Sequence, residues 1–381
     1  MALLTFLRVL RVILYTPWLL SRFVFDILFC ILPWTRPARE WSLNQAIRVR
    51  AVRLVLLYWS LLKTGDHLPL KPGKECNRFA IIQPAPTKLY QGPLQDPVVR
   101  PQPVGATWTP ARPPPPVVVG PNMTVALHFH GGAFVIGDGR DHDAGFTART
   151  LIRHMGCTHV CSPQYRLSSH RGSHFPSQLQ DAVTSYVYLL RERRIPARQI
   201  VFSGDSAGGN LALGLLRYIH EHGRELDLPA PGAVTLWSPW VDVSGALLQD
   251  MRMSPHYKTD YLNADFGRWG AVTVTNGGAI DPANPYLSPL HHPFRLEGDG
   301  SNRNVPMYIN GGDREVLSDD IRAFAKAYGA LGWDVHLCMS RGCPHDAILL
   351  GDRMGFGREA EEAAREAREF LLRASTLFLR G

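Results

Sequence analysis

The serine at position 206 lies in a sequence setting that could turn its hydroxyl into a nucleophile. Residues 204–208, Gly-Asp-Ser-Ala-Gly, have the pattern G-x-S-x-G, and Gly209 follows them. An apolar run at 200–202 precedes the pattern and a helix-like run at 210–218 follows it, the order of a strand, a sharp turn and a helix. Such a turn holds the serine Oγ at the top of a sheet, ready to attack a carbonyl carbon. Glycines at 204 and 208 keep the crowded turn free of clashes. The pattern alone is weak, because an ordinary strand-to-helix turn can contain it by chance.

A second candidate feature lies upstream, where a predicted strand at 124–129 runs into His130-Gly131-Gly132-Ala133. Attack on an ester carbonyl makes an oxyanion, and preorganised backbone N–H groups are its usual donors. We predict that these donors are the amides of Gly131, Gly132 and Ala133, together with that of Ala207, the residue after the serine. The alternative for this segment is a tight turn with a structural histidine.

A base and an orienting acid are needed as well, because a serine hydroxyl is a poor nucleophile until its proton is taken. The chain order expected for this architecture is serine, acid, histidine. His345 follows the last predicted strand, at 334–339, and is the predicted base. Asp313 lies just past a predicted strand at 305–309, where sites lie in open α/β sheets, and is the predicted acid. Glu315 is the alternative acid.

Other carboxylates and histidines in this half of the chain fit structural roles better. A carboxylate in the first turn of a helix is favoured by the helix dipole, and a histidine inside a strand pattern is usually a packing residue. The weaker candidates are Asp319 and Asp320 at a helix start, His336 in a strand, His291 and His292 in a proline-flanked loop, and Asp346, which would lie beside the ring of His345 rather than behind it.

This set of motifs resembles the hormone-sensitive-lipase-like branch of the α/β-hydrolases. That branch carries an H-G-G-G motif, a G-D-S-A-G-G motif, an aspartate after the next-to-last strand and a late histidine. The matching residues here, over roughly residues 75 to 375, are His130 to Ala133, Gly204 to Gly209 with Asp205 among them, Asp313 and His345. Ala133 stands where the family usually has a third glycine, so we expect a narrower loop. The resemblance implies carboxylester hydrolysis without a metal or an organic cofactor, and a variable N-terminal cap.

The rest of the chain predicts an α/β fold. Apolar residues at helical spacing fall at 179–190, 211–216, 321–331 and 360–371, and each stripe can pack on a sheet. Strands that alternate with such helices indicate a mostly parallel, doubly wound sheet, here of the α/β-hydrolase type. We divide the chain into a membrane-associating segment (1–35), a helical cap (36–75) and a catalytic domain (76–381). An aromatic-rich insertion at about 238–295 either lines an acyl or alcohol pocket or forms a small satellite core.

The first 32 residues are mostly apolar, yet they match neither a signal peptide nor an uninterrupted spanning helix. On one continuous helix the four charges, Arg8, Arg11, Arg22 and Asp26, share a sector of ~60°. Three interpretations follow: a helix in the membrane interface, a spanning helix, or a helix that packs on the catalytic body. We favour membrane attachment, although Pro17 could divide the stripe. Together with Tyr165-Arg166-Leu167, this apolar start more loosely resembles fungal membrane-bound steryl-acetate-type deacetylases. Residues 41–63 predict a cap helix between membrane and active-site mouth, or a plain buried cap helix.

Composition limits the partners. The 381 residues carry a net charge of +8, which can indicate nucleic acid or an anionic membrane surface. No nucleic-acid-binding motif is present, so the membrane surface is the better interpretation, at the endoplasmic reticulum or another endomembrane. Six cysteines lack a metal-binding spacing, and we expect free thiols and no metal. Asn122 is a glycosylation sequon, and Pro113 to Pro116 predict an extended segment.

The predicted function is therefore a membrane-associated serine carboxylesterase or deacetylase that acts on short-chain esters of a hydrophobic alcohol. Two alternatives remain open. A ligand-binding protein could use the same fold without catalysis, although such proteins usually lose a member of the triad. An acyltransferase would pass the acyl group to an alcohol instead of water, through the same acyl-enzyme. Residue types alone do not decide the oligomeric state.

Overall fold

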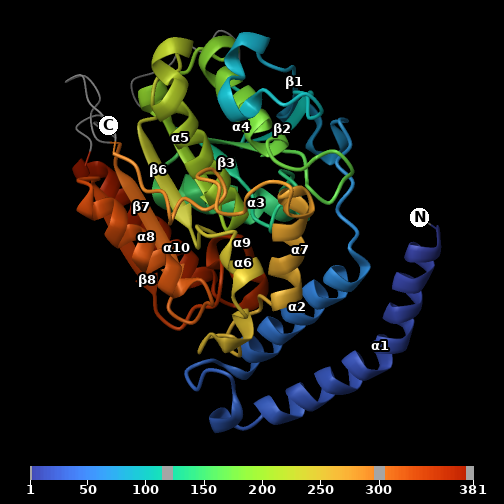
Figure 1. The fold of residues 1–381 in the computed structure, drawn as a ribbon. Helices are drawn as coiled ribbons and strands as arrows, with labels where there is room; N and C mark the ends of the chain where they lie inside the picture. Colours follow the sequence, from blue (N-terminus) through green and yellow to red (C-terminus); the bar gives the residue numbers. More distant parts are fainter. Residues whose placement is uncertain (1, 114–122, 296–304, 375–381) are drawn as a thin grey trace.

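Eight strands form one mixed sheet at the centre of the protein, with helices around it (Figure 1). The computed structural model describes residues 2–113, 123–295 and 305–374, so Asn122 and most of Pro113 to Pro116 lie outside the described residues. The strand order is β1-β2-β4-β3-β5-β6-β7-β8. The strands are β1 (Phe79–Ile82), β2 (Val104–Thr109), β3 (Val125–Phe129), β4 (His159–Gln164), β5 (Ile200–Asp205), β6 (Ala233–Trp237), β7 (Met307–Gly312) and β8 (Val335–Ser340).

Parallel pairing runs from β4 to β8, and only β2 pairs in the antiparallel sense, with β1 and with β4. This confirms the predicted α/β-hydrolase type of sheet. Because helices cover the central strands, β3, β5, β6 and β7 are buried along their whole length, and β5 and β7 begin with apolar residues and end in polar residues and glycine at the edge of the sheet. The carboxyl ends of β5, β7 and β8 therefore meet at one edge, where the candidate residues lie.

The helices predicted from apolar spacing are present. The catalytic part contains α3 (Asp141–Thr150), α4 (Ser177–Val187), α5 (Ala207–Leu226), α6 (Gly245–Leu248), α7 (Ala264–Val274), α8 (Ser318–Ala330), α9 (Ala347–Met354) and α10 (Gly357–Ala374). Each predicted stripe faces the core: in α10, for example, the alanines of the stripe, Phe370 and Leu371 are buried. Asp319 and Asp320 lie in the first turn of α8, as predicted.

The strand β2 lies in a segment whose composition favours a loop. Residues 84–121 are rich in proline and glycine, yet β2 lies inside this range. Backbone hydrogen bonds with both β1 and β4 hold β2 in the sheet, so tertiary pairing outweighs the local composition.

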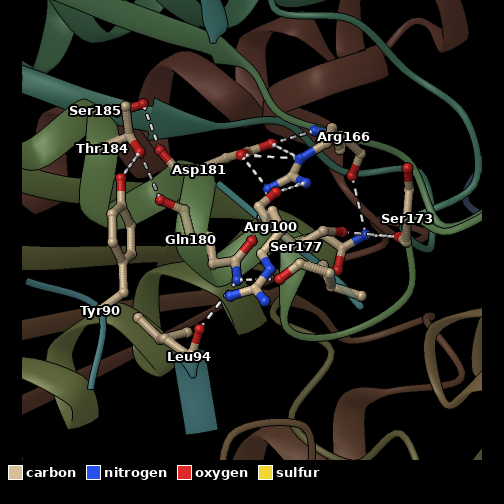
Figure 2. A network of polar contacts seen from close by, with 12 residues as sticks. Tyr90, Leu94, Arg100, Arg166, Ser173, Ser177, Gln180, Asp181, Thr184 and Ser185 are labelled. Carbon is tan, nitrogen blue, oxygen red and sulfur yellow. Dashed lines mark hydrogen bonds and ion pairs between the residues drawn. The ribbon is translucent and has the colours of Figure 1, made fainter. Parts of the chain in front are cut away.

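A buried polar network fastens the connection before β2 to α4 (Figure 2). Arg166, which follows β4, forms an ion pair with Asp181 of α4 at 2.7 Å. Its guanidinium also donates to the carbonyl oxygens of Arg100 and Ser177. Gln180 donates to two further carbonyl groups in the connection. These side chains donate to backbone oxygens that no hydrogen bond of the sheet satisfies.

Two helices precede the catalytic domain, α1 (Ala2–Cys30) and α2 (Leu43–Leu62). The helix α1 runs along the outer side of α2 and extends beyond the body of the protein (Figure 1), while α2 contacts α7 and α9. Pro17 lies inside α1 without ending it. The segment Val9–Cys30 is long and apolar enough to cross a membrane, and only 11% of its apolar window is buried. Packing on the catalytic body therefore covers little of its apolar surface.

Candidate active site

Ser206 occupies the turn between β5 and α5, as the sequence predicts. Its backbone has φ 50° and ψ −117°, a combination that few residues other than glycine adopt, and strain of this kind is common at functional sites. A Cβ on Gly208 would lie 2.0 Å from the carbonyl oxygen of Phe129, and a Cβ on Gly204 would lie 2.2 Å from that of Gly208. The turn therefore requires these glycines, and it aims the serine side chain at the edge of the sheet.

His345 reaches Ser206 from the loop between β8 and α9. Its Nε2 lies 2.9 Å from the Oγ of Ser206, within the distance that proton transfer needs. Its Nδ1 lies 3.3 Å from Oε2 of Glu315, and both side chains are almost fully buried. Burial would lower the pKa of His345, but the hydrogen bond to Glu315 and the charges of Glu315 and Asp260 outweigh it, so the pKa is raised.

The carboxylate behind the imidazole is Glu315, not Asp313, and this corrects the predicted acid. Asp313 follows β7 as expected, but its Oδ1 accepts a hydrogen bond from the amide of Gly342 at 2.7 Å. Asp313 therefore holds the backbone of the loop that carries His345 and does not contact the imidazole. Glu315 lies two residues further on, and its carboxylate faces Nδ1 of His345.

Two buried residues that sequence reasoning did not single out support Glu315 and His345. Ser238 donates from Oγ to Oε2 of Glu315 at 2.6 Å and accepts from the amide of Asp346. Asp260 accepts from the amides of His345 and Val316. Neither residue belongs to a recognisable local motif, since each acts through contacts with residues far away in the sequence.

The loop after β3 offers a smaller set of oxyanion donors than predicted. The amide of Gly131 donates to Oδ2 of Asp205 at 2.6 Å, so it is not free to bind an oxyanion. Gly132 and Ala133 both have positive φ. Within the described part of the chain, no acceptor takes the amides of Gly132, Ala133 or Ala207. These three N–H groups remain as candidate donors.

Asp205, next to the nucleophile, holds this loop in place. Besides the amide of Gly131, it contacts Nε2 of His128 at 3.0 Å. Burial works against its charge, yet the hydrogen bond with His128 lowers the pKa of Asp205. Burial and the nearby charge of Asp205 raise the pKa of Asp346 well above its ordinary value. The raised pKa favours the protonated form of Asp346 next to the carboxylate of Asp205.

His130 has a structural place in the same loop. Its ring stacks on Tyr165 with the centroids 4.3 Å apart, and the hydroxyl of Tyr165 donates to its carbonyl oxygen at 2.6 Å. Burial lowers the pKa of His130, which favours the neutral ring. Its side chain therefore supports the loop instead of taking part in proton transfer.

Two cavities of very different size meet at Ser206. The larger, of about 320 Å³, reaches the serine and His345 and is lined mainly by apolar side chains of α2 and α9: Ala51, Val52, Val55, Leu56 and Trp59, with Leu349 and Leu350. The smaller, of about 20 Å³, lies against Ala133 and is lined by Trp240, Met251, Leu262, Phe266 and Leu317. Both cavities use residues of the 238–295 insertion, and α2 covers the larger one as a cap.

Comparison with known proteins agrees with this geometry. Residues 126–349 match the family model of an alpha/beta hydrolase fold. The chain is 32% identical over 206 residues to an acetyl-hydrolase of Streptomyces hygroscopicus, covering 53% of this chain and 60% of that protein. It is 31% identical over 245 residues to the versiconal hemiacetal acetate esterase of Emericella nidulans, covering 62% and 77%.

A solved structure is similar as well. A hormone-sensitive lipase from a metagenome library aligns with a TM-score of 0.55 and 25% identity, over 72% of this chain and 82% of that one. The arrangement of serine, histidine and carboxylate around Ser206 is the one that a serine hydrolase requires. The chain therefore belongs to the α/β-hydrolase fold family, in its hormone-sensitive-lipase-like branch.

Proposed function

We propose that this protein is a serine carboxylesterase with Ser206, His345 and Glu315 as its catalytic triad. The observation that carries the proposal is the chain of contacts from Oγ of Ser206 to Nε2 of His345 and from Nδ1 of His345 to Glu315, at 2.9 and 3.3 Å. A protein that only binds a ligand has no need of this alignment. Burial of all three side chains keeps competing water away from the proton-transfer path.

The mechanism follows from these contacts. Oγ of Ser206 attacks the ester carbonyl while Nε2 of His345 takes the hydroxyl proton. Glu315 fixes the tautomer with the proton on Nδ1 and stabilises the imidazolium. The amides of Gly132, Ala133 and Ala207 hold the oxyanion. The alcohol then leaves with the proton from His345, and a water molecule, deprotonated by the same ring, attacks the acyl-serine and releases the carboxylic acid.

The unequal cavities support a short acyl group on a bulky apolar alcohol. The cavity of about 20 Å³ lies beside Ala133, a candidate oxyanion donor, and it is only slightly above the roughly 10–15 Å³ that a cavity needs to hold one water. We therefore expect an acyl chain longer than two or three carbons to exceed the space between Met251 and Trp240. The cavity of about 320 Å³ under α2 suits the alcohol. The names of the two relatives, an acetyl-hydrolase and an acetate esterase, favour acetate.

Membrane attachment through α1 is the second part of the proposal. The large apolar side chains on its outer side are exposed, among them Ile13 at 61%, Leu14 at 68% and Trp18 at 57%, whereas Val12 and Leu19 pack inward. An apolar face of this size in water is costly, and insertion into the lipid interface would cover it. A lipophilic ester dissolved in that membrane would then be close to the cavity under α2.

A fluorescent fluorophosphonate probe tests the catalytic part directly. The wild-type protein should be labelled and Ser206→Ala should not, with both proteins equally folded by circular dichroism. The wild type should then hydrolyse p-nitrophenyl acetate faster than the butyrate and octanoate, and acetate esters of sterols more readily than longer-chain sterol esters. An active Ser206→Ala protein would refute the triad, and equal rates for acetate and octanoate would refute the short acyl pocket.

A further inference from the structure

A third cavity, separate from those at Ser206, lies between α1, α2 and α7. Its volume is about 210 Å³, and it shares no lining residue with the catalytic cavities. Three cations from the three helices line it: Arg11 of α1, Lys63 at the end of α2 and Arg268 of α7. Asp265 is the single carboxylate among the lining residues.

These three cations lack partners. Within the ranges that the structure describes, none of them has a carboxylate within ion-pair distance or an acceptor for its side-chain donors, and Asp265 has no cation within that distance. Like charges that converge on one cavity repel each other, and because these side chains are exposed, water reduces but does not remove the repulsion. With one carboxylate among them the lining residues carry a net charge of +2, which a bound anion would neutralise.

Phosphate is the anion whose chemistry fits this lining. The planar, forked guanidinium groups of Arg11 and Arg268 can each donate two hydrogen bonds to phosphate oxygens, and the ammonium of Lys63 adds a compact charge. The volume of about 210 Å³ is many times the roughly 10–15 Å³ that a cavity needs to hold one water, so it can hold a phosphate group with bridging water. The buried side chain of Trp269 forms an apolar wall.

The place of the cavity on α1 indicates where that phosphate would come from. Arg11 lies on the flank of α1, between the inward-facing Val12 and Leu19 and the outward-facing Leu14 and Trp18. A helix is about 10 Å across with its side chains, and an interfacial helix buries its apolar face about 5–10 Å into the acyl boundary. Arg11, on the flank of α1, would then lie at the edge of the inserted face, where its long side chain can reach the lipid phosphates.

We propose that the cavity formed by Arg11, Lys63 and Arg268 binds the phosphate headgroup of an anionic phospholipid. This inference rests on the proposed membrane attachment of α1 and adds lipid selectivity to it. The headgroup contact would fix the rotation of α1 about its axis and, through α2, the placement of the capped active site relative to the lipid surface.

Vesicle binding of the full-length protein tests the inference. Vesicles of phosphatidylcholine alone are compared with vesicles that also contain phosphatidic acid, at one ionic strength. The wild type should bind the anionic vesicles more tightly. In the double variant Lys63→Gln/Arg268→Gln the affinity for anionic vesicles should fall roughly 25-fold, since each cation near an anionic surface contributes roughly fivefold. Its affinity for phosphatidylcholine vesicles should be unchanged.

The matched control removes the same charges elsewhere. Arg322 and Lys326 are exposed on α8 and are also without a charged partner in the described part of the chain. Arg322→Gln/Lys326→Gln should bind anionic vesicles like the wild type. An equal loss in both double variants would show that only net charge matters and would overturn the site.

Three further outcomes separate the possible sources of the phosphate and the two proposals. If soluble glycerol phosphate, compared with chloride at the same ionic strength, stabilises the wild type against heating as strongly as short-chain phosphatidic acid does, the site is one for free phosphate and the lipid assignment fails. If the wild type binds neither kind of vesicle, membrane attachment itself fails. Binding to both kinds with equal affinity leaves the attachment intact and overturns the headgroup site alone.

Discussion

At the scale of single residues, we expect substitutions of Glu315 and of Asp313 to differ sharply in their effect on kcat. Glu315→Gln keeps the size of the side chain but removes the charge that fixes the tautomer of His345, so kcat should fall about 10³- to 10⁴-fold. Asp313→Asn keeps an oxygen that can accept from the amide of Gly342, and kcat should stay within a few-fold of the wild type. Steady-state hydrolysis of p-nitrophenyl acetate measures both.

The control for this pair is the folded state of each variant. Thermal melts should show that Glu315→Gln remains folded at the assay temperature, because Ser238 still donates to the side chain at this position. If instead Glu315→Gln keeps the kcat of the wild type and Asp313→Asn is folded but inactive, then Asp313 is the acid of the triad.

The raised pKa of His345 predicts the acid side of the pH profile. Burial would lower this pKa, but Glu315 and Asp260 raise it above the ordinary value of about 6.5. The base must be neutral to accept a proton, so kcat/KM should decline as the pH falls through a midpoint above about 6.5. In Glu315→Gln the main raising influence is lost while burial remains, and the midpoint of the residual activity should move to lower pH. A midpoint that does not move would show that Glu315 does not face the ring.

The site could be predicted from the sequence only where the signal is local. Ser206 and His345 stand out because a glycine-bounded turn and a loop after the last strand mark them. The choice between Asp313 and Glu315 depends on how the chain turns after β7, which two residues of spacing do not reveal. Likewise, nothing near Gly131 in the sequence shows that the carboxylate of Asp205 takes its amide.

At the scale of elements, the segment just before α2 clamps the loops that carry the acid and the base. Nε1 of Trp41 donates to the buried carbonyl oxygen of Gly342 at 2.6 Å, and Glu40 forms an ion pair with Arg314 at 2.6 Å. Amphipathic spacing predicts α2 and the helices beside the sheet correctly, because apolar residues at helical spacing are enough to indicate a helix that packs on one side. It does not predict β2, because the place of this strand depends on its pairing with β1 and with β4. It does not predict the clamp either, because the clamp joins residues about 300 positions apart.

The clamp gives a stability prediction. Trp41→Phe retains most of the buried ring but leaves the carbonyl oxygen of Gly342 without its donor, so the free energy of unfolding should fall by about 1–3 kcal/mol. Trp34→Phe makes the same chemical change at a side chain that is 65% exposed, and its effect should stay within about 0.5 kcal/mol. Urea denaturation of both variants measures the difference. Equal losses would mean that the indole N–H of Trp41 adds nothing to the clamp.

At the scale of the whole molecule, the exposed apolar surface is concentrated on α1, on the side away from the sheet. A few exposed apolar side chains are ordinary on a soluble protein, and Val98, Leu248 and Met253, exposed by 75%, 79% and 82%, are of that kind. On α1 such side chains recur from Phe6 to Phe29. Their concentration on one helix, together with the cavity under α2, supports the proposed membrane attachment.

Substitution of the outer side of α1 tests this arrangement. Ile13→Gln/Leu14→Gln/Trp18→Gln changes residues that pack little against the protein, so fluorophosphonate labelling of Ser206 should be retained. Binding to phosphatidylcholine vesicles should fall roughly a hundredfold, because each side chain loses about 1 kcal/mol, around half the value for full burial. The matched variant Val98→Gln/Leu248→Gln/Met253→Gln removes equally exposed apolar groups from the catalytic body and should bind vesicles like the wild type. If both variants keep wild-type binding, α1 does not insert through this side, and if both lose it equally, the vesicles contact the catalytic body as much as the helix.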